Sequence, residues 1–199
     1  MASKKTIQLT QLSILAALIV VLQLMSYLLA RLGVFPLSLV LIPLVIGGNL
    51  FGPRAGAGLG LVFGAIVVAA CALGWDGSYL WIMEPGFTAL VCLTKGVMAG
   101  WLGALVARLF QKMNKPGTAV LVSAVVTPIV NTGIFTAGVW FLLREPLTKM
   151  AIEFGAGETT IEYLFLTLVG VNFVVEFVVN VALVPATKRI IVAVQRGMR

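Results

Sequence analysis

The chain has 199 residues, of which 60% are hydrophobic and only 11% are charged. A soluble domain of this length cannot bury so much apolar surface internally, so lipid must cover part of it. The formal charge of +7 does not indicate a nucleic-acid partner, because the basic residues lie between hydrophobic segments instead of forming one basic face.

Long apolar runs recur along the whole chain. A spanning helix needs roughly 20 apolar residues, and several charge-free or nearly charge-free runs reach that length. We therefore predict an all-α polytopic membrane protein, a compact bundle of six transmembrane helices in a single domain. The expected spans cover residues 7–30, 36–51, 55–73, 86–109, 118–143 and 162–185.

The basic residues predict the orientation. Cytoplasmic connections of membrane proteins are enriched in Lys and Arg. With both termini in the cytoplasm, the inner segments hold ten basic residues and no acid, whereas the outer connections hold three basic and six acidic residues. An even number of spans is needed to keep all the basic clusters on one side. The inner residues are Lys4, Lys5, Arg54, Arg108, Lys112, Lys115, Lys188, Arg189, Arg196 and Arg199.

Glycines recur at four-residue spacing in the third and fourth spans. Gly56, Gly60 and Gly64 form one strip, and Gly96 and Gly100 form another. Small residues let two helix backbones approach closely in a membrane, so these strips predict tight helix packing.

The outer loop between the third and fourth spans is aromatic. Trp75, Tyr79 and Trp81 could be ordinary interfacial anchors. Alternatively, together with Asp76 they could close a ligand pocket, because aromatic rings beside an acid suit a small organic molecule. Both interpretations stay open at this point.

Polar residues inside three spans are the strongest functional signal. Counted from the outer face at a rise of ~1.5 Å per residue, Lys95 lies roughly 12 Å deep, Asn172 roughly 15 Å and Asn131 roughly 18 Å. Glu176 follows Asn172 by four residues and shares its helix face. A charge at the bilayer centre costs at least ~2.5 kcal/mol. We expect Lys95 to anchor a substrate carboxylate or phosphate, with Asn131, Thr132 and Asn172 as hydrogen-bond partners.

Three alternatives accompany this hypothesis. Lys95 and Glu176 could form an ion pair that only locks two helices together. Glu176 could instead carry protons in a secondary transporter. An intramembrane enzyme ranks last, because the chain has no histidine and buries only one acid, so an acid–base pair is hard to assemble. We expect no catalytic residue, no metal site and no cofactor; the two cysteines show no metal-ligand spacing.

Five sequence strings, taken in order, resemble the substrate-binding S-component of energy-coupling factor (ECF) vitamin transporters. The first span contains TQLSILAALIVVL, and the second runs into the third as IPLVIGGNLFGPRAGAGLGLVFG. The fourth span contains LVCLTKGVMAGWLGALV. The fifth and sixth contain TPIVNTGIF and NFVVEFVVNVALVPA, which are similar to a subgroup that includes pantothenate binders.

The resemblance implies a bacterial plasma-membrane subunit that captures a water-soluble vitamin at high affinity. Its partners would be an EcfT-type transmembrane coupling subunit, docked through Ser13 and Ala17, and two ATPase subunits. It would not be an enzyme, since no GxxxxGK[ST] phosphate loop is present. Pantothenate is the first choice of substrate because its carboxylate suits Lys95; riboflavin or a pyridoxine-like compound would fit if Glu176 neutralises that lysine.

Overall fold

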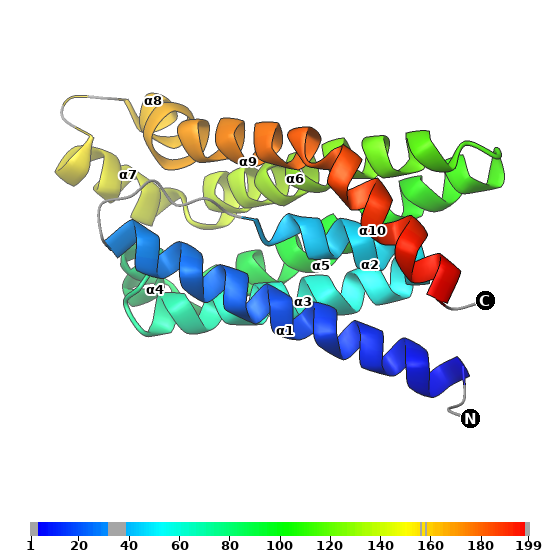
Figure 1. Cartoon of the computed structure of the whole chain (residues 1–199). Helices are drawn as coiled ribbons and strands as arrows, with labels where there is room; N and C mark the ends of the chain where they lie inside the picture. The colour runs from blue at the N-terminus through cyan, green and yellow to red at the C-terminus, as the bar shows by residue number, and fades with distance from the viewer. Residues whose placement is uncertain (1–3, 32–38, 156, 158, 198–199) are drawn as a thin grey trace.

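The computed structural model describes residues 4–31, 39–155, 157 and 159–197 (Figure 1). These residues are almost entirely helical and form no strand, which confirms the all-α prediction. The elements in chain order are α1 (Lys4–Arg31), α2 (Leu41–Phe51), α3 (Pro53–Ala72), α4 (Ser78–Met83), α5 (Pro85–Lys112), α6 (Pro116–Leu142), α7 (Arg144–Phe154), α8 (Thr160–Glu162), the π-helix η1 (Tyr163–Gly170), α9 (Val171–Ala182) and α10 (Val184–Gly197).

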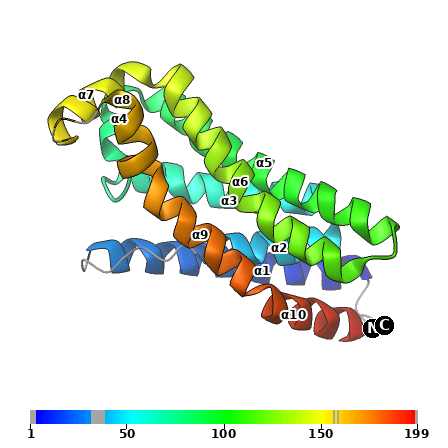
Figure 2. The same ribbon diagram turned by 90° about the horizontal axis from the view of Figure 1, so that it is seen from above.

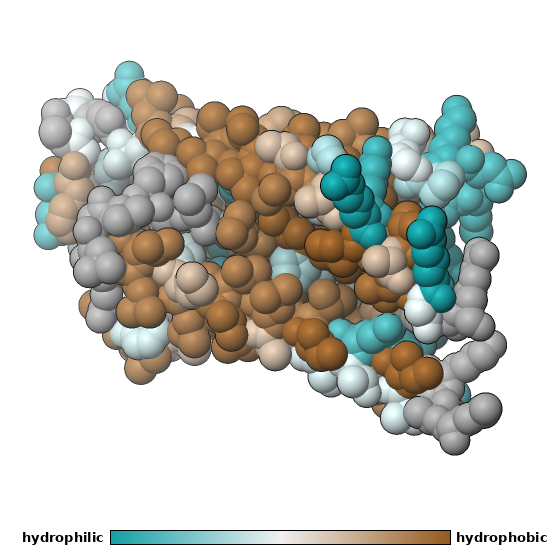
Figure 3. Space-filling model, in the orientation of Figure 1, coloured by the Kyte–Doolittle hydropathy of each residue, from teal (hydrophilic) through white to brown (hydrophobic). Residues whose placement is uncertain are grey.

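Five helical stretches of the described chain are long and apolar enough to cross a membrane. They are α1, α3, α5, α6 and the continuous stretch Thr160–Ala182. Figure 3 shows the corresponding apolar band across the middle of one face of the molecule. The protein is therefore a polytopic membrane protein. The helix α2 is apolar but only 11 residues long, and residues 36–38 of the predicted second span lie outside the described part, so a sixth crossing stays a prediction.

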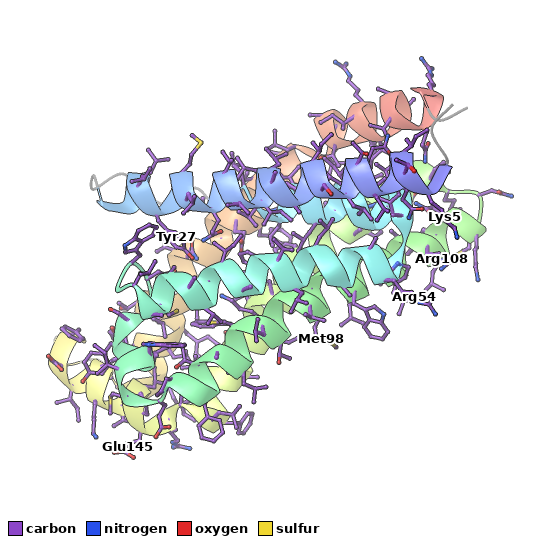
Figure 4. All side chains as sticks on the ribbon, turned by 90° about the horizontal axis from the view of Figure 1, so that it is seen from below. Lys5, Tyr27, Arg54, Met98, Arg108 and Glu145 are labelled. Carbon is purple, nitrogen blue, oxygen red and sulfur yellow. The ribbon has the colours of Figure 1, made fainter. Side chains whose placement is uncertain are left out.

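The two termini lie at the same end of the bundle (Figures 1 and 2). Figure 4 places Lys5, Arg54 and Arg108 toward that end and Glu145 at the opposite end. Termini at one end fit an even number of crossings. The separation of charge fits the predicted orientation, in which the basic end faces the cytoplasm.

The helices α3 and α5 pack closely because glycines face each other along their contact. A Cβ atom added to Gly60 would collide with the carbonyl oxygen of Gly96, and one added to Gly56 would collide with that of Gly100. No helix pair of the described chain is in more extensive contact than α3 and α5. The sequence prediction of close packing at these strips is thus confirmed, and this pair forms one firm wall of the bundle.

The stretch from α8 to α9 packs differently. It buries only about half as large a share of its length as α3 does. Its first eight residues after α8 form the π-helix η1, which is wider than an α-helix and is common at functional sites. This side of the bundle is the less tightly packed one, and it borders the site described below.

Candidate functional site

A polar cavity of about 420 Å³ lies inside the bundle, between α1, α3, α5, α6 and the η1–α9 stretch. The loop after α3 and the short helix α4 contribute to its wall at the end opposite the termini. Of the nine residues that the sequence suggests for substrate binding, eight line this cavity. They are Trp75, Asp76, Tyr79, Lys95, Asn131, Thr132, Asn172 and Glu176.

Lys95 provides a positive charge inside the cavity. It is half-buried on α5, and its ammonium nitrogen lies 4.6 Å from the ring centroid of Phe135 and 5.9 Å from that of Phe63. The electron-rich faces of aromatic rings stabilise a cation without neutralising it. The rings therefore hold the ammonium in place on α5 while its charge remains available to a ligand.

A buried acid and an amide lie on the helices opposite Lys95. Glu176 is only 4% exposed, and one of its carboxylate oxygens accepts a hydrogen bond of 3.4 Å from the side-chain nitrogen of Asn131. The amide of Asn180 donates to the backbone oxygen of Glu176 at 2.8 Å, one turn further along α9. Asn172 borders the cavity from a more exposed position on the same helix. Asn172 and Glu176, which the sequence places on one helix face, thus both line the cavity, whereas Asn180 does not.

The outer end of the cavity is held together by two aromatic residues. The Tyr79 hydroxyl donates a hydrogen bond of 2.9 Å to a carboxylate oxygen of Glu153, which links α4 to α7. This bond to a carboxylate raises the pKa of Tyr79 above its ordinary value. Trp75 packs edge-on against Tyr27 of α1, with ring centroids 6.3 Å apart. These contacts tie the loop after α3 and α4 to two neighbouring helices.

Trp81 is the one proposed binding residue that does not line the cavity. It packs instead against the apolar cluster that contains Phe63, Val67 and Cys71. Tyr79 and Trp81 are two residues apart on α4, and residues at that spacing lie on different faces of a helix. We therefore leave Trp81 out of the candidate site.

Three cavity residues on α1 were not predicted from the sequence. Gln23, Ser26 and Tyr27 are all buried, and all line the cavity. Their spacing of three and four residues puts them on one helix face, so a search for polar residues at helical spacing in the first span would have found them. With these residues, α1 forms a wall of the site and is not only a membrane anchor.

Three buried polar atoms of cavity-lining residues make no hydrogen bond that meets the geometric criteria within the described residues. They are the side-chain carbonyl oxygens of Gln23 and Asn131 and the hydroxyl oxygen of Tyr27. Buried polar groups are normally hydrogen-bonded, and leaving one unpaired costs about 1–3 kcal/mol. Because these atoms are almost fully covered, a polar ligand in the cavity would pair with them only after their side chains turn toward it.

Two thiols complete the wall between α3 and α5. Cys71 and Cys92 are free, buried, and adjacent to the cavity. Within the described residues, no group of three or more His, Cys, Asp or Glu side chains is arranged to hold a metal ion.

The predicted docking residues lie elsewhere. Ser13 and Ala17 are exposed on α1, one turn apart, among large apolar side chains such as Ile14 and Leu18. They do not touch the cavity. The structure thus separates the candidate binding residues from the candidate docking residues.

The fold and the cavity define a polytopic α-helical membrane protein with an internal polar site. Residues 7–187 match the family described as ECF transporter, substrate-specific component. The chain belongs to this family. Its members are the substrate-binding subunits of importers and not enzymes, and they associate with an ECF module that contains the coupling and ATPase subunits. No match was found among curated proteins or among solved structures.

Proposed function

We propose that the chain captures a small, carboxylate-bearing, water-soluble vitamin in the polar cavity and delivers it to an ECF-type importer, with pantothenate as the first candidate. The observation that supports this most directly is the grouping of the cation Lys95, the buried acid Glu176 and several neutral polar side chains around a single cavity. Ligand pockets typically measure roughly 300–1,000 Å³, so a cavity of about 420 Å³ suits a small molecule.

The chemical match between pantothenate and the cavity is specific. Its carboxylate would bind the ammonium of Lys95, which lies near the rings of Phe63 and Phe135. Its hydroxyl groups could donate to the side-chain oxygens of Gln23 and Asn131, and its amide oxygen could accept from Tyr27. These contacts would require the three side chains to turn toward the cavity, because their polar atoms are almost fully covered.

A neutral ligand is the second candidate. Glu176 is buried beside the same cavity, so it can offset the charge of Lys95. Aromatic rings from α3 and α6 then favour a planar molecule such as riboflavin or a pyridoxine-like compound. Membership of the S-component family favours capture for an ATP-driven importer over a proton-coupled carrier that uses Glu176.

Titration of the purified chain with radiolabelled pantothenate tests the first candidate. We expect Lys95→Met to weaken binding by about tenfold to a hundredfold, because a hydrogen bond to a charged group is worth about 1.5–3 kcal/mol. Lys112→Met, an exposed lysine at the far end of the same helix, should bind as the unchanged chain does. Equal affinity of the Lys95→Met variant and the unchanged chain would refute the role of Lys95. Tight binding of riboflavin and none of pantothenate would favour the neutral ligand.

We also propose that Ser13 and Ala17 dock on the coupling subunit. Both are small and exposed in the membrane span α1, so a partner helix can approach the backbone there. Ala17→Trp should abolish co-purification with the coupling and ATPase subunits while leaving vitamin affinity intact. Ala65→Trp, at an exposed alanine of α3, is the matched control. Co-purification of the Ala17→Trp variant with all of its partner subunits would contradict this docking site.

Finally, we propose that the chain resides in the bacterial plasma membrane with the basic end in the cytoplasm. An impermeant maleimide applied to intact cells should label a cysteine placed at Glu145 and not one placed at Lys115. The native thiols are buried and give a low background. The reverse labelling pattern would invert the orientation.

A further inference from the structure

A second concavity lies on the outside of the bundle, between α6 and the η1–α9 stretch. It measures about 650 Å³ and is separate from the polar cavity. We call it the lateral groove. Its lining side chains are apolar apart from the hydroxyls of Thr132 and Thr136 and the indole nitrogen of Trp140. Such a surface does not suit the proposed vitamin, because the groove offers almost no hydrogen-bonding group.

The sequence explains why the lateral groove exists. On α6, Gly133 and Ala137 are small, whereas Trp140 and Phe141 one turn further on are large. A Cβ atom added to Gly133 would meet nothing within 4 Å, so the space above this glycine is open. On the other side of the groove, the π-helix η1 passes α6 without packing closely against Gly133 and Ala137. The groove is therefore bounded by small residues on α6, and the aromatic rings of Trp140 and Phe141 form part of its wall.

The lateral groove lies in the part of the molecule that faces lipid. Phe141, Phe165 and Val174 line it, and all three are more than half exposed. They belong to α6 and to the stretch Thr160–Ala182, both long and apolar enough to span a membrane. An empty groove in a bilayer loses dispersion contacts on both of its walls. In a membrane, the acyl chains of lipids would fill this groove.

A positive charge marks one end of the lateral groove. The guanidinium carbon of Arg144 lies 4.4 Å from the ring centroid of Trp140, which is a lining residue. Arg144 is exposed and makes no ion pair within 4 Å among the described residues. The acids next to it in the fold are engaged elsewhere: Glu145 is paired with Lys149 at 2.7 Å, and Glu162 accepts hydrogen bonds from Thr159 at 2.8 Å. The guanidinium is thus available to an anion at the membrane surface.

We propose that the lateral groove binds one acyl chain of an anionic phospholipid whose phosphate is held by Arg144. Arginine suits a phosphate because its planar guanidinium can donate two parallel hydrogen bonds. The lipid would lie in the leaflet on the side of α7, opposite the termini. Its chain would pack against Thr132, Val169 and Phe173, which also line the polar cavity. The lipid would therefore support the cavity wall from behind.

Native mass spectrometry of the detergent-purified chain tests this site with phosphatidylglycerol and phosphatidylcholine of the same acyl chains. The unchanged chain should retain one phosphatidylglycerol molecule under activation that removes phosphatidylcholine. Arg144→Gln should reduce this retention by about fivefold, because one basic residue near a membrane surface contributes about 1 kcal/mol. Arg108→Gln, an exposed arginine at the opposite end, should keep the tightly held lipid.

A groove-filling variant provides the second arm. Gly133→Leu places a side chain in the open space of the groove and should prevent retention of phosphatidylglycerol. Gly58→Leu is its matched control, since Gly58 is also exposed on a spanning helix with nothing within 4 Å of an added Cβ atom. Unchanged lipid retention in both Arg144→Gln and Gly133→Leu would overturn the proposal. Normal lipid retention combined with loss of the coupling and ATPase subunits from Gly133→Leu would make the groove a protein interface instead.

Discussion

The two sides of the polar cavity are built in opposite ways. On one side, α3 and α5 meet through facing glycines whose backbones leave no room for a side chain. On the other side, η1 and α9 lie against α6 more loosely and leave the lateral groove between them. Lys95 projects from the tightly packed side, and Glu176 belongs to the loosely packed one. The cation Lys95 is thus carried by the tightly packed pair α3 and α5, and the more loosely packed η1 and α9 complete the site.

This difference has a physical origin. Close contact between backbones fixes the separation of two helices, because any larger residue would collide with main-chain atoms that cannot rotate away. A contact made by long side chains across a groove can be repacked by changes of rotamer. An S-component must admit and release a substrate, and we expect the more loosely packed side formed by η1 and α9 to move when it does.

We expect the largest effect on stability from disrupting the close contact between α3 and α5. Gly60→Leu would drive a side chain into the backbone of Gly96 and should destabilise the chain by about 3 kcal/mol or more. Thermal unfolding of the purified chain, followed by intrinsic tryptophan fluorescence, measures this. Gly58→Leu, two residues earlier on the exposed face of the same helix, is the control and should melt at the temperature of the unchanged chain. Equal melting temperatures of the two variants would show that the glycine contacts do not stabilise the packing of α3 against α5.

A smaller effect is expected from the loosely packed wall. Asn131→Leu replaces a cavity-lining polar side chain and removes the amide that donates to Glu176. We expect vitamin affinity to fall by about tenfold, since a hydrogen bond contributes about 1 kcal/mol and leaving a partner unpaired costs somewhat more. Isothermal titration calorimetry measures the change. Thr118→Val, at the other end of α6, should bind normally. A loss of stability without a loss of affinity would make Asn131 a purely structural residue.

The smallest effect is expected at the outer end of the cavity. Tyr79→Phe removes the hydrogen bond to Glu153 that links α4 to α7, and it should speed vitamin release without changing the melting temperature. The pKa of Tyr79 is raised, because its protonated hydroxyl donates to a carboxylate. The link is therefore complete at neutral pH and is lost only as the pH rises through that raised pKa, above the usual tyrosine range. Release rates measured by rapid mixing should rise at high pH in the unchanged chain and stay flat in Tyr79→Phe.

Much of this architecture could be predicted from the sequence. The apolar runs and the cost of placing charges in lipid determine where the helices lie, and the glycine spacing identifies the contact between α3 and α5. Lys95 and Glu176 stand out for the same reason, since an ionisable residue in a span is costly unless it is used. These signals are local, and each depends on one segment of the chain.

What the sequence did not reveal depends on how the helices are arranged. Gln23 and Tyr27 carry no charge, and their helical spacing shows only that they share one face of α1; that this face lines the cavity depends on how α3 and α5 are placed. Trp81 was grouped with Tyr79 because both lie in one loop sequence, but α4 directs them to different faces. Gly133 and Ala137 leave space on α6, but the lateral groove forms only where η1 lies beside them, and the sequence of α6 does not show which helix is its neighbour.

The most direct test of the account is to identify what the cavity of the purified chain contains. Extraction of the protein with organic solvent, followed by mass spectrometry, should release about one carboxylate-bearing vitamin per chain from the unchanged protein and almost none from Lys95→Met. Recovery of the same vitamin in equal amount from both proteins would contradict a substrate site organised around Lys95.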